Sequence, residues 1–293
     1  MKKYLYPDFL VKIINEKLNI YIKDYKTSPE ILRKAISYSL KNGGKRFRPV
    51  LCLAVAGSLG CSHEDVVPTA CAIELIHTYS LIHDDLPSID NDDLRRGKPT
   101  CHKIFGEDIA ILTGDALFAE AFNIILKYQQ SGSEKKIEVL TELGQASGAL
   151  GMVAGQTVDV FYTGKEISRQ KLMYMHKNKT GKLIIAAVRC GAILCNASHD
   201  HMNKFTRYAE NIGMAFQITD DILDVVSSSE DIGKTAGKDS LQNKNTFPSM
   251  FGIEKSARIA EKKVSEAIHI VKSMEINSEW LIKIANFLLL RKS

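Results

Sequence analysis

Long apolar runs, a strong net charge and paired cysteine motifs are all missing from this sequence of 293 residues. The longest stretch without a charged residue, residues 143–158, is short for a membrane span and is diluted by four glycines, two glutamines and a serine. Residues 1–19 interleave charged and apolar positions and lack the apolar block of a signal peptide. We therefore expect no membrane span and a cytoplasmic location.

The net charge is only +5, and the basic residues do not alternate with aromatic ones as they would on a base-stacking surface. A nucleic-acid partner is therefore not expected. The pattern Gly-x-x-x-x-Gly-Lys-Ser/Thr is also absent, which argues against a nucleotide P-loop. The six cysteines form no Cys-x-x-Cys pair and no zinc-type spacing, so we expect buried, reduced thiols at positions 52, 61, 71, 101, 190 and 195.

Apolar residues spaced three and four apart dominate the chain and predict helices. The predicted helical segments are 9–25, 31–40, 50–59, 66–82, 109–126, 137–160, 183–194, 205–225, 257–271 and 280–290. No clean alternating strand is visible, and hairpin dipeptides are absent from strand boundaries. The prediction is one all-α domain over residues 1–293, with about ten or more helices. Within its longest predicted helix, we expect close helix packing along one stripe of glycines at 144, 148, 151 and 155.

One face of the segment 205–225 gathers several polar side chains. Residues three and four apart are neighbours in a helix, so this face holds Gln217, Asp220, Asp221 and Asp224. Carboxylates placed in this way repel each other, and no basic residue lies within a turn to offset them. A bound cation is the simplest compensation, and all-oxygen ligation suits Mg²⁺ or Ca²⁺.

A second acidic segment ends the apolar pattern that contains His77. His77 lies two helical turns before Asp84, so both side chains point the same way. Asp90 is out of helical phase with Asp84, and we expect Pro87 to interrupt the helix and let Asp90 fold back. Two further acids are interpreted as solvated groups or as partners of neighbouring arginines: Asp92 and Asp93.

Basic clusters beside glycine or proline accompany both acidic segments. They lie at residues 43–49, 95–99, 178–182 and 233–239. Each cluster alone is typical of an ordinary surface turn. Together with the acids, they favour a polyanion held between metal ions and cationic side chains, and a diphosphate is the natural ligand.

In these motifs the sequence resembles the trans-prenyltransferases, specifically the bacterial farnesyl diphosphate synthases. The match covers nearly the whole chain, through GGKRFRP (43–49), ELIHTYSLIHDDLPSIDNDDLRRGKPTCH (74–102), GQTVD (155–159), KT (179–180), FQITDDILD (216–224) and GKTAGKD (233–239). The resemblance implies antiparallel helices around a deep central cavity, usually in a homodimer, with the acidic segments facing each other across the mouth. It also implies Mg²⁺ as the cofactor, three ions per site, with Mn²⁺ as an alternative.

The resemblance also carries roles onto individual residues. The metal ligands would be Asp84, Asp90 and Asp220, supported by Asp85 and Asp224. Isopentenyl diphosphate would be held by Lys45, Arg48, His77 and Arg96, and the allylic diphosphate by Arg95, Lys179 and Lys234. The groups near the developing cation would be Lys179, Thr180 and Gln217. The C-terminal residues 291–293 match loosely and receive no role.

The implied reaction condenses isopentenyl diphosphate with dimethylallyl and then geranyl diphosphate to give (2E,6E)-farnesyl diphosphate. It would proceed by ionisation, condensation and elimination, with the released diphosphate as the final proton acceptor. Tyr79 lies five residues before Asp84, roughly 7–8 Å deeper at 1.5 Å per residue. In the family, an aromatic residue here, together with the insertion Pro87-Ser88, goes with a fifteen-carbon product. Tyr79 is therefore the predicted chain stop, although ordinary core packing would also explain it.

Three alternatives stay open from the sequence. The nearest is the same chemistry with a geranyl or geranylgeranyl product. A terpene cyclase shares the acidic motifs, but it needs no second diphosphate site, and the clusters at 43–49 and 95–97 argue against it. A non-catalytic subunit of a heteromeric synthase would be expected to have lost one acidic segment, whereas both are complete here.

Overall fold

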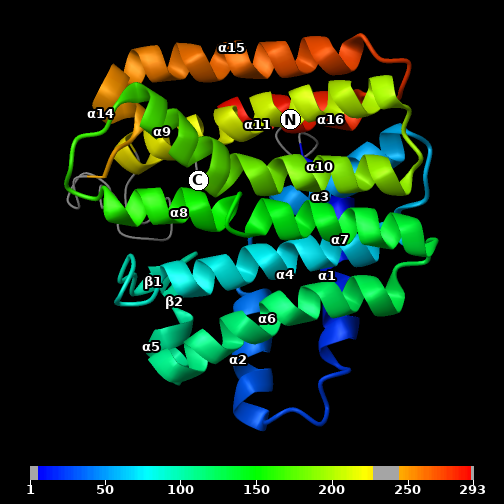
Figure 1. Ribbon diagram of the computed structural model, residues 1–293, viewed down its shortest axis with the longest axis vertical. Coiled ribbons are helices and arrows are strands. Elements are labelled where there is room, and N and C mark those ends of the chain that lie inside the picture. Colours follow the sequence, from blue (N-terminus) through cyan, green and yellow to red (C-terminus); the bar gives the residue numbers. More distant parts are fainter. Residues whose placement is uncertain (1–5, 227–243, 292–293) are drawn as a thin grey trace.

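The computed structural model describes residues 6–226 and 244–291. Helices make up nearly all of the regular structure there, which confirms the all-α prediction. They are α1 (Asp8–Ile22), α2 (Glu30–Lys41), α3 (Phe47–Ser58), η2 (His63–Asp65), α4 (Val67–Asp84), α5 (Cys101–Phe105), α6 (Glu107–Tyr128), α7 (Ser133–Ser147), α8 (Met152–Phe161), α9 (Arg169–His176), η3 (Lys177–Gly181), α10 (Lys182–Leu194), α11 (His199–Val226), α14 (Phe247–Phe251), α15 (Ile253–Lys272) and α16 (Glu279–Leu290). Figure 1 shows long helices stacked on one another, from α15 through α10 and α7 to α4 and α6.

The centre of the molecule is built by α3, α4 and α10, which pack against one another. Almost every residue of α3 is buried. On α4, Ile73 and Ile76 are fully buried, and each such side chain contributes about 1.5–3 kcal/mol of burial free energy. Gly191 of α10 lies so close to α3 that a Cβ atom there would collide with the carbonyl oxygen of Cys52. This close-packed centre fixes the end of α4, where the first acidic segment begins.

The predicted helix 137–160 is wrong, because the structure divides it into α7 and α8. Gly148 and Gly151 adopt non-helical backbone angles at the break, and a Cβ atom on Gly151 would collide with the backbone of Ala146. The single glycine stripe is therefore wrong as well. Gly144 has no neighbour near its Cβ position, and only Gly155 makes a close inter-element contact, against the backbone of Lys179.

A two-residue hairpin corrects the expectation that no strand is present. Strands β1 (Leu94–Arg95) and β2 (Lys98–Pro99) pair antiparallel, and they appear beside the end of α4 in the view of Figure 1. The turn residues Arg96 and Gly97 have φ angles of 55° and 74°, as a tight hairpin turn requires. The signal was missed because Arg-Gly is not among the usual hairpin dipeptides and the strands are too short to alternate.

The cysteine prediction holds for four residues and fails for two. Cys52, Cys71, Cys101 and Cys190 are buried and free. Cys61 and Cys195 instead form a disulfide, with their Cα atoms 6.1 Å apart. This bond links the segment after α3 to the end of α10. The two cysteines lie 134 positions apart, so the sequence does not reveal the pairing.

Helix α6 is the one helix in the described ranges that is long and apolar enough to cross a membrane by length and composition. In the sequence, charged residues such as Asp115 and Glu120 interrupt this stretch, so it does not stand out as an apolar run. In the fold, one side of α6 packs against α4, as a core helix of a globular protein does. Its other side exposes Ile111, Leu112 and Leu126.

Candidate active site

A cavity of about 850 Å³ lies among α4, α8, η3 and α11. Most of the predicted site residues line it: Arg48, His77, Tyr79, Asp84, Asp90, Arg95, Arg96, Lys179, Thr180, Gln217, Asp220 and Asp224. Residues that are more than 100 positions apart in the chain therefore meet in one place. Two predicted residues, Lys45 and Asp85, do not line the cavity, and Lys234 falls outside the described residues.

The first acidic segment folds as its sequence predicts. Helix α4 ends at Asp84, and the backbone N–H of Asp90 donates a hydrogen bond to the carbonyl oxygen of Asp84 (2.9 Å). Both side chains therefore face the cavity. Burial raises the pKa of Asp84 to about 6, opposed by the ammonium group of Lys179 and reinforced by the carboxylate of Asp90. A cation bound here would remove that penalty on the charged form.

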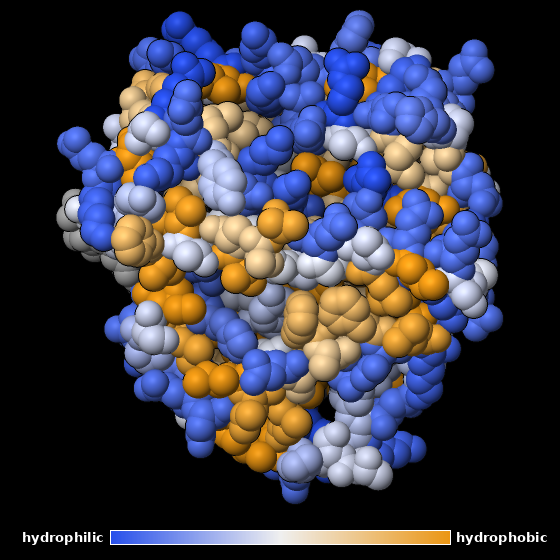
Figure 2. Space-filling model, viewed as in Figure 1, coloured by the Kyte–Doolittle hydropathy of each residue, from blue (hydrophilic) through white to orange (hydrophobic). Residues whose placement is uncertain are grey.

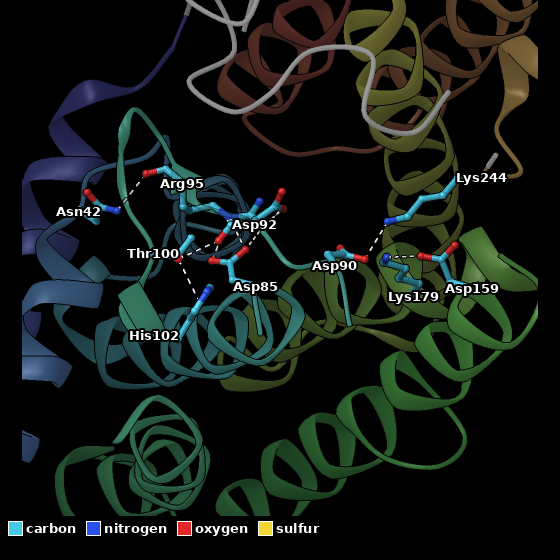
Figure 3. Close-up of polar contacts among 10 residues, drawn as sticks. All are labelled: Asn42, Asp85, Asp90, Asp92, Arg95, Thr100, His102, Asp159, Lys179 and Lys244. Carbon is cyan, nitrogen blue, oxygen red and sulfur yellow. Dashed lines mark hydrogen bonds and ion pairs between the residues drawn. The ribbon is translucent and has the colours of Figure 1, made fainter. Parts of the chain in front are cut away.

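Asp85 points the other way from its neighbour Asp84. It is buried, and its carboxylate accepts hydrogen bonds from Nε and Nη2 of Arg95. Asp92 lies 3.3 Å from the same guanidinium group, which confirms its interpretation as a partner of an arginine. Figure 3 shows the two carboxylates beside Arg95, in a group separate from Asp90. The structure thus places Asp85 behind an arginine, where it orients a cationic side chain rather than facing the cavity.

Two lysines form ion pairs with aspartates that line the cavity. Lys179 Nζ lies 2.5 Å from Asp159 on α8, and Lys244 Nζ lies 2.8 Å from Asp90. Figure 3 shows the two ion pairs side by side. Neither Asp159 nor Lys244 received a role from the sequence. The signal for Asp159 was its place at the end of the GQTVD motif, whereas Lys244 lies beyond the motifs that were recognised.

Lys179 and Thr180 belong to a single wide turn, the π-helix η3, between α9 and α10. Such turns inside a helix are rare and often occur at functional sites. Here the turn brings Thr180 toward α11, where its hydroxyl donates to Oε1 of Gln217 (2.5 Å). Gly155 allows α8 to approach the Lys179 backbone closely. The predicted pair of oxygen dipoles is therefore assembled from two different elements.

The second acidic segment lies on one face of α11, as predicted, with Gln217, Asp220, Asp221 and Asp224 all lining the cavity. No basic residue lies within a turn of these acids in the sequence, but a distant one offsets part of their charge. Arg291, at the end of α16, donates from Nη2 to Oδ1 of Asp220 (2.5 Å), and its guanidinium group lies over the ring of Phe216. Arg291 received no role from the sequence because residues 291–293 match the family only loosely, and its partner Asp220 lies 71 positions away.

A basic pocket forms beside this segment. Arg48 Nη1 lies 3.3 Å from Nε2 of His77, and Arg96 contacts the carbonyl oxygen of Gly43. Burial, and then the charge of Arg48, lowers the pKa of His77 well below its ordinary value, so this imidazole is neutral near pH 7. Lys45 is exposed, with its amino group 5.3 Å from the ring centre of Phe287. The four residues that the resemblance assigned to isopentenyl diphosphate therefore lie near one another.

Comparison with known proteins agrees with this geometry. The family profile "Polyprenyl synthetase" matches residues 29–284. The chain belongs to the polyprenyl synthetase family. It is 44% identical to the geranylgeranyl diphosphate synthase of Cyanophora paradoxa over 96% of this chain and 94% of that one, and 39% identical to the farnesyl diphosphate synthase of Bacillus subtilis (strain 168) over 96% and 95%. The geranyltransferase of Helicobacter pylori, solved with magnesium and isoprenyl diphosphate, superposes with a TM-score of 0.84 at 30% identity, covering 99% and 98%.

Membership of this family gives the reaction class, which is the elongation of a prenyl diphosphate by a prenyltransferase. The donor chemistry fits the divalent metal that the family uses. Asp84 and Asp90 face the cavity from one side and Asp220 from the other, and all supply oxygen. No group of three acidic, histidine or cysteine side chains forms a metal cage among the residues described. Separate carboxylates that face one cavity suit Mg²⁺, which commonly takes one or two carboxylates and completes its shell with water and substrate phosphates.

Proposed function

We propose that this polyprenyl synthetase makes farnesyl diphosphate by condensing isopentenyl diphosphate with dimethylallyl and then geranyl diphosphate. The observation that carries the proposal is the floor of the cavity. Tyr79 lines the cavity one and a half turns below Asp84, and its ring packs edge-on against Phe118 of α6, with centroids 5.0 Å apart. Phe118 in turn contacts Phe122 (5.2 Å). Three rings packed edge-to-face beneath Asp84 would leave little depth for a chain beyond fifteen carbons.

The alternative is a geranylgeranyl product, since relatives of both kinds are similar to this chain. Chromatography of the products formed from isopentenyl and dimethylallyl diphosphates separates the two. We expect farnesyl diphosphate from the wild type. A dominant twenty-carbon product would refute the farnesyl assignment while leaving the reaction class intact.

The floor itself is tested by Tyr79→Ala. We expect longer products, because removing the ring extends the cavity toward Phe118. Tyr79→Phe is the matched control: it keeps the ring and the contact with Phe118, and it should retain the wild-type product. An active Tyr79→Ala enzyme with unchanged products would show that the chain stop lies elsewhere.

The residues of the site support an ionisation mechanism. Bound Mg²⁺, held by Asp84, Asp90 and Asp220, would supply positive charge at the allylic diphosphate. Arg95, Lys179 and Lys244 add fixed cations that stabilise the charge growing on the leaving group. Thr180 and Gln217 both line the cavity, and their oxygen atoms would stabilise the allylic cation. Lys45, Arg48, His77 and Arg96 would orient isopentenyl diphosphate so that its double bond attacks. The released diphosphate would accept the proton that is lost.

The exposed side of α6 supports a homodimer. Ile111, Leu112 and Leu126 on α6 and Ile137 on α7 are 44–65% exposed. Figure 2 shows apolar side chains collected over the face where α6–α8 lie. A contiguous apolar surface of this kind marks an interaction site. Light scattering during gel filtration should give twice the chain mass of 32.6 kDa. Leu112→Asp should shift the mass to that of a monomer, whereas Ile253→Asp, at an exposed position on α15, should not.

A further inference from the structure

The neighbouring acids Asp220 and Asp221 on α11 have different environments. The side chain of Asp220 is 43% exposed, whereas that of Asp221 is 3% exposed. Oδ1 of Asp221 accepts a hydrogen bond from Nε2 of Gln217 (2.7 Å), and Oδ2 accepts one from the backbone N–H of Phe247 (2.9 Å). Both carboxylate oxygens therefore take part in the protein wall.

The contact with Gln217 determines which way its amide group points. An ionised carboxylate can only accept hydrogen bonds, so Gln217 must turn its NH₂ group toward Asp221. Its Oε1 atom is thereby directed to the opposite side, where it accepts from the hydroxyl of Thr180. Without this partner, the two ends of the amide are nearly equal in shape, and the NH₂ group could equally face the cavity.

We propose that Asp221 is a positioning residue, which holds the carbonyl oxygen of Gln217 toward the reacting carbon. This inference rests on the proposed function, because it assigns Gln217 to stabilisation of the allylic cation. A carbonyl oxygen directed at developing positive charge stabilises it, whereas an NH₂ group in the same place opposes it. Asp221 thus controls the sign of a dipole at the reaction centre without touching the substrate.

The surroundings of Asp221 explain why a carboxylate is needed there. Two donors, Nε2 of Gln217 and the N–H of Phe247, converge on it. An asparagine has a single acceptor oxygen and can satisfy only one of them. If that oxygen accepts from Phe247, the asparagine NH₂ group faces Gln217 and forces its amide to reverse.

Ring packing and a helix cap hold the wall behind Asp221, where these donors lie. The ring of His176 stacks on that of Phe247, with centroids 5.3 Å apart and an interplanar angle of 23°. His176 is 4% exposed, and burial lowers its pKa to about 3, so it adds no charge near Asp221 at neutral pH. The Phe247 N–H is itself at the start of α14, fixed by the capping box of Thr246 and Ser249.

A swap of side chains tests the proposal. Asp221→Asn should lower kcat about ten- to hundredfold, as loss of an orienting outer partner does, with the KM values and the Mg²⁺ concentration for half-maximal activity nearly unchanged. Gln217→Glu should also lower kcat, because it places a second carboxylate against Asp221. In the double variant Asp221→Asn/Gln217→Glu, the asparagine donates to the glutamate, and an oxygen again faces Thr180. We expect the double variant to recover at least tenfold over either single variant.

Two outcomes would overturn the inference: independent losses that multiply in the double variant, or a raised Mg²⁺ requirement in Asp221→Asn like that of the control Asp220→Asn. The first would show that the two side chains do not act together, and the second would make Asp221 a metal ligand. The midpoint temperatures of thermal unfolding, measured on the ligand-free proteins, test the pairing of Asp221 with Gln217 independently of activity. Each single variant should unfold at a lower temperature, and the double variant should regain part of the loss. A wild type that fails to elongate would refute the proposed function, while the unfolding data would still test the pairing.

Discussion

Each of the two acidic segments begins with a pair of neighbouring aspartates, and in each pair the two members have different environments. At the end of α4, Asp84 lines the cavity and Asp85 turns back to Arg95. On α11, Asp220 is open to the cavity and Asp221 is buried against Gln217. The first residue of each pair is therefore available to a metal ion. The second contacts a neighbouring side chain, Arg95 in one segment and Gln217 in the other, and in the proposed reaction it would orient that side chain toward substrate.

The segments differ in how the backbone delivers the remaining acid. α11 continues through its acids without interruption, so Asp224 reaches the cavity by helical spacing alone. α4 ends at Asp84, and Asp90 returns through a backbone hydrogen bond. A regular helix tolerates no change in spacing, whereas a turn can accept insertions. The first segment, which also carries His77 and Tyr79, is therefore the part of the site that can vary between products.

The largest effect is expected from the first member of each pair. Asp84→Ala and Asp220→Ala should each reduce kcat/KM by about a thousandfold or more, since each removes a carboxylate that would hold a metal ion, worth several kcal/mol in the transition state. Circular dichroism should show an unchanged helix content. Steady-state kinetics at saturating Mg²⁺ measure the loss. Near-normal Mg²⁺-dependent turnover in either variant would contradict the metal assignment.

The second member of the first pair should give a smaller and different effect. Asp85→Asn removes the charge that holds Arg95, so the KM for the allylic diphosphate should rise about tenfold, the scale of one charge-assisted hydrogen bond. Asp93→Asn is the matched control, because the Asp93 side chain is exposed and forms a surface ion pair with Lys103 (2.7 Å). An effect of Asp85→Asn confined to the Mg²⁺ requirement would instead place Asp85 among the metal ligands.

For physical reasons, the sequence predicts where the acidic side chains lie but not which cations pair with them. Helical spacing was enough to place Gln217, Asp220 and Asp224 on one face, and Pro87 was enough to expect the return of Asp90. The partners of the charges were not predictable in this way. Arg291 and Lys244 reach their acids from 71 and 154 positions away, across contacts that only the packed fold creates. Local periodicity contains no information about such distances.

The break between α7 and α8 and the wide turn at Lys179–Thr180 were missed for a related reason. The break lies at Gly148 and Gly151, whose backbone angles are not helical, whereas the wide turn has helical residues on both sides, so neither is marked by a change in the apolar spacing. The glycines at 148 and 151 were identified in the sequence. Glycine, however, occurs both in closely packed helices and at helix breaks, so the residue type alone did not distinguish the two. The family motifs marked GQTVD and KT as important without showing that Gly155 and Lys179 touch.

The pH dependence should reveal the charge balance around the second segment. Partial burial, and then the nearby charge of Arg291, lowers the pKa of Lys45 to about 8, whereas an ordinary lysine stays charged to about pH 10.4. Lys45 is therefore cationic below pH 8 and loses its charge above it. The KM for isopentenyl diphosphate should rise as the pH increases from 8 to 9, by up to about tenfold. Lys45→Arg keeps its charge in this range and should abolish the rise, and an identical profile in that variant would exclude Lys45 as the cause.

The smallest effect is expected from Arg291. Its bond to Asp220 is a feature that distinguishes the second acidic segment from the first. In the ligand-free structure it is bonded to Asp220, so a metal ion must compete with it there. Arg291→Ala should therefore tighten Mn²⁺ binding to the substrate-free protein by about two- to fivefold, the range of a partly exposed ion pair. Electron paramagnetic resonance of free Mn²⁺ measures this binding directly. Lys283→Ala, which removes another ion pair of α16, with Glu279, should leave it unchanged. Equal Mn²⁺ affinity in the Arg291→Ala variant and the wild type would mean that Asp220 binds metal without displacing the arginine, and the two segments would then be alike in their access to the ion.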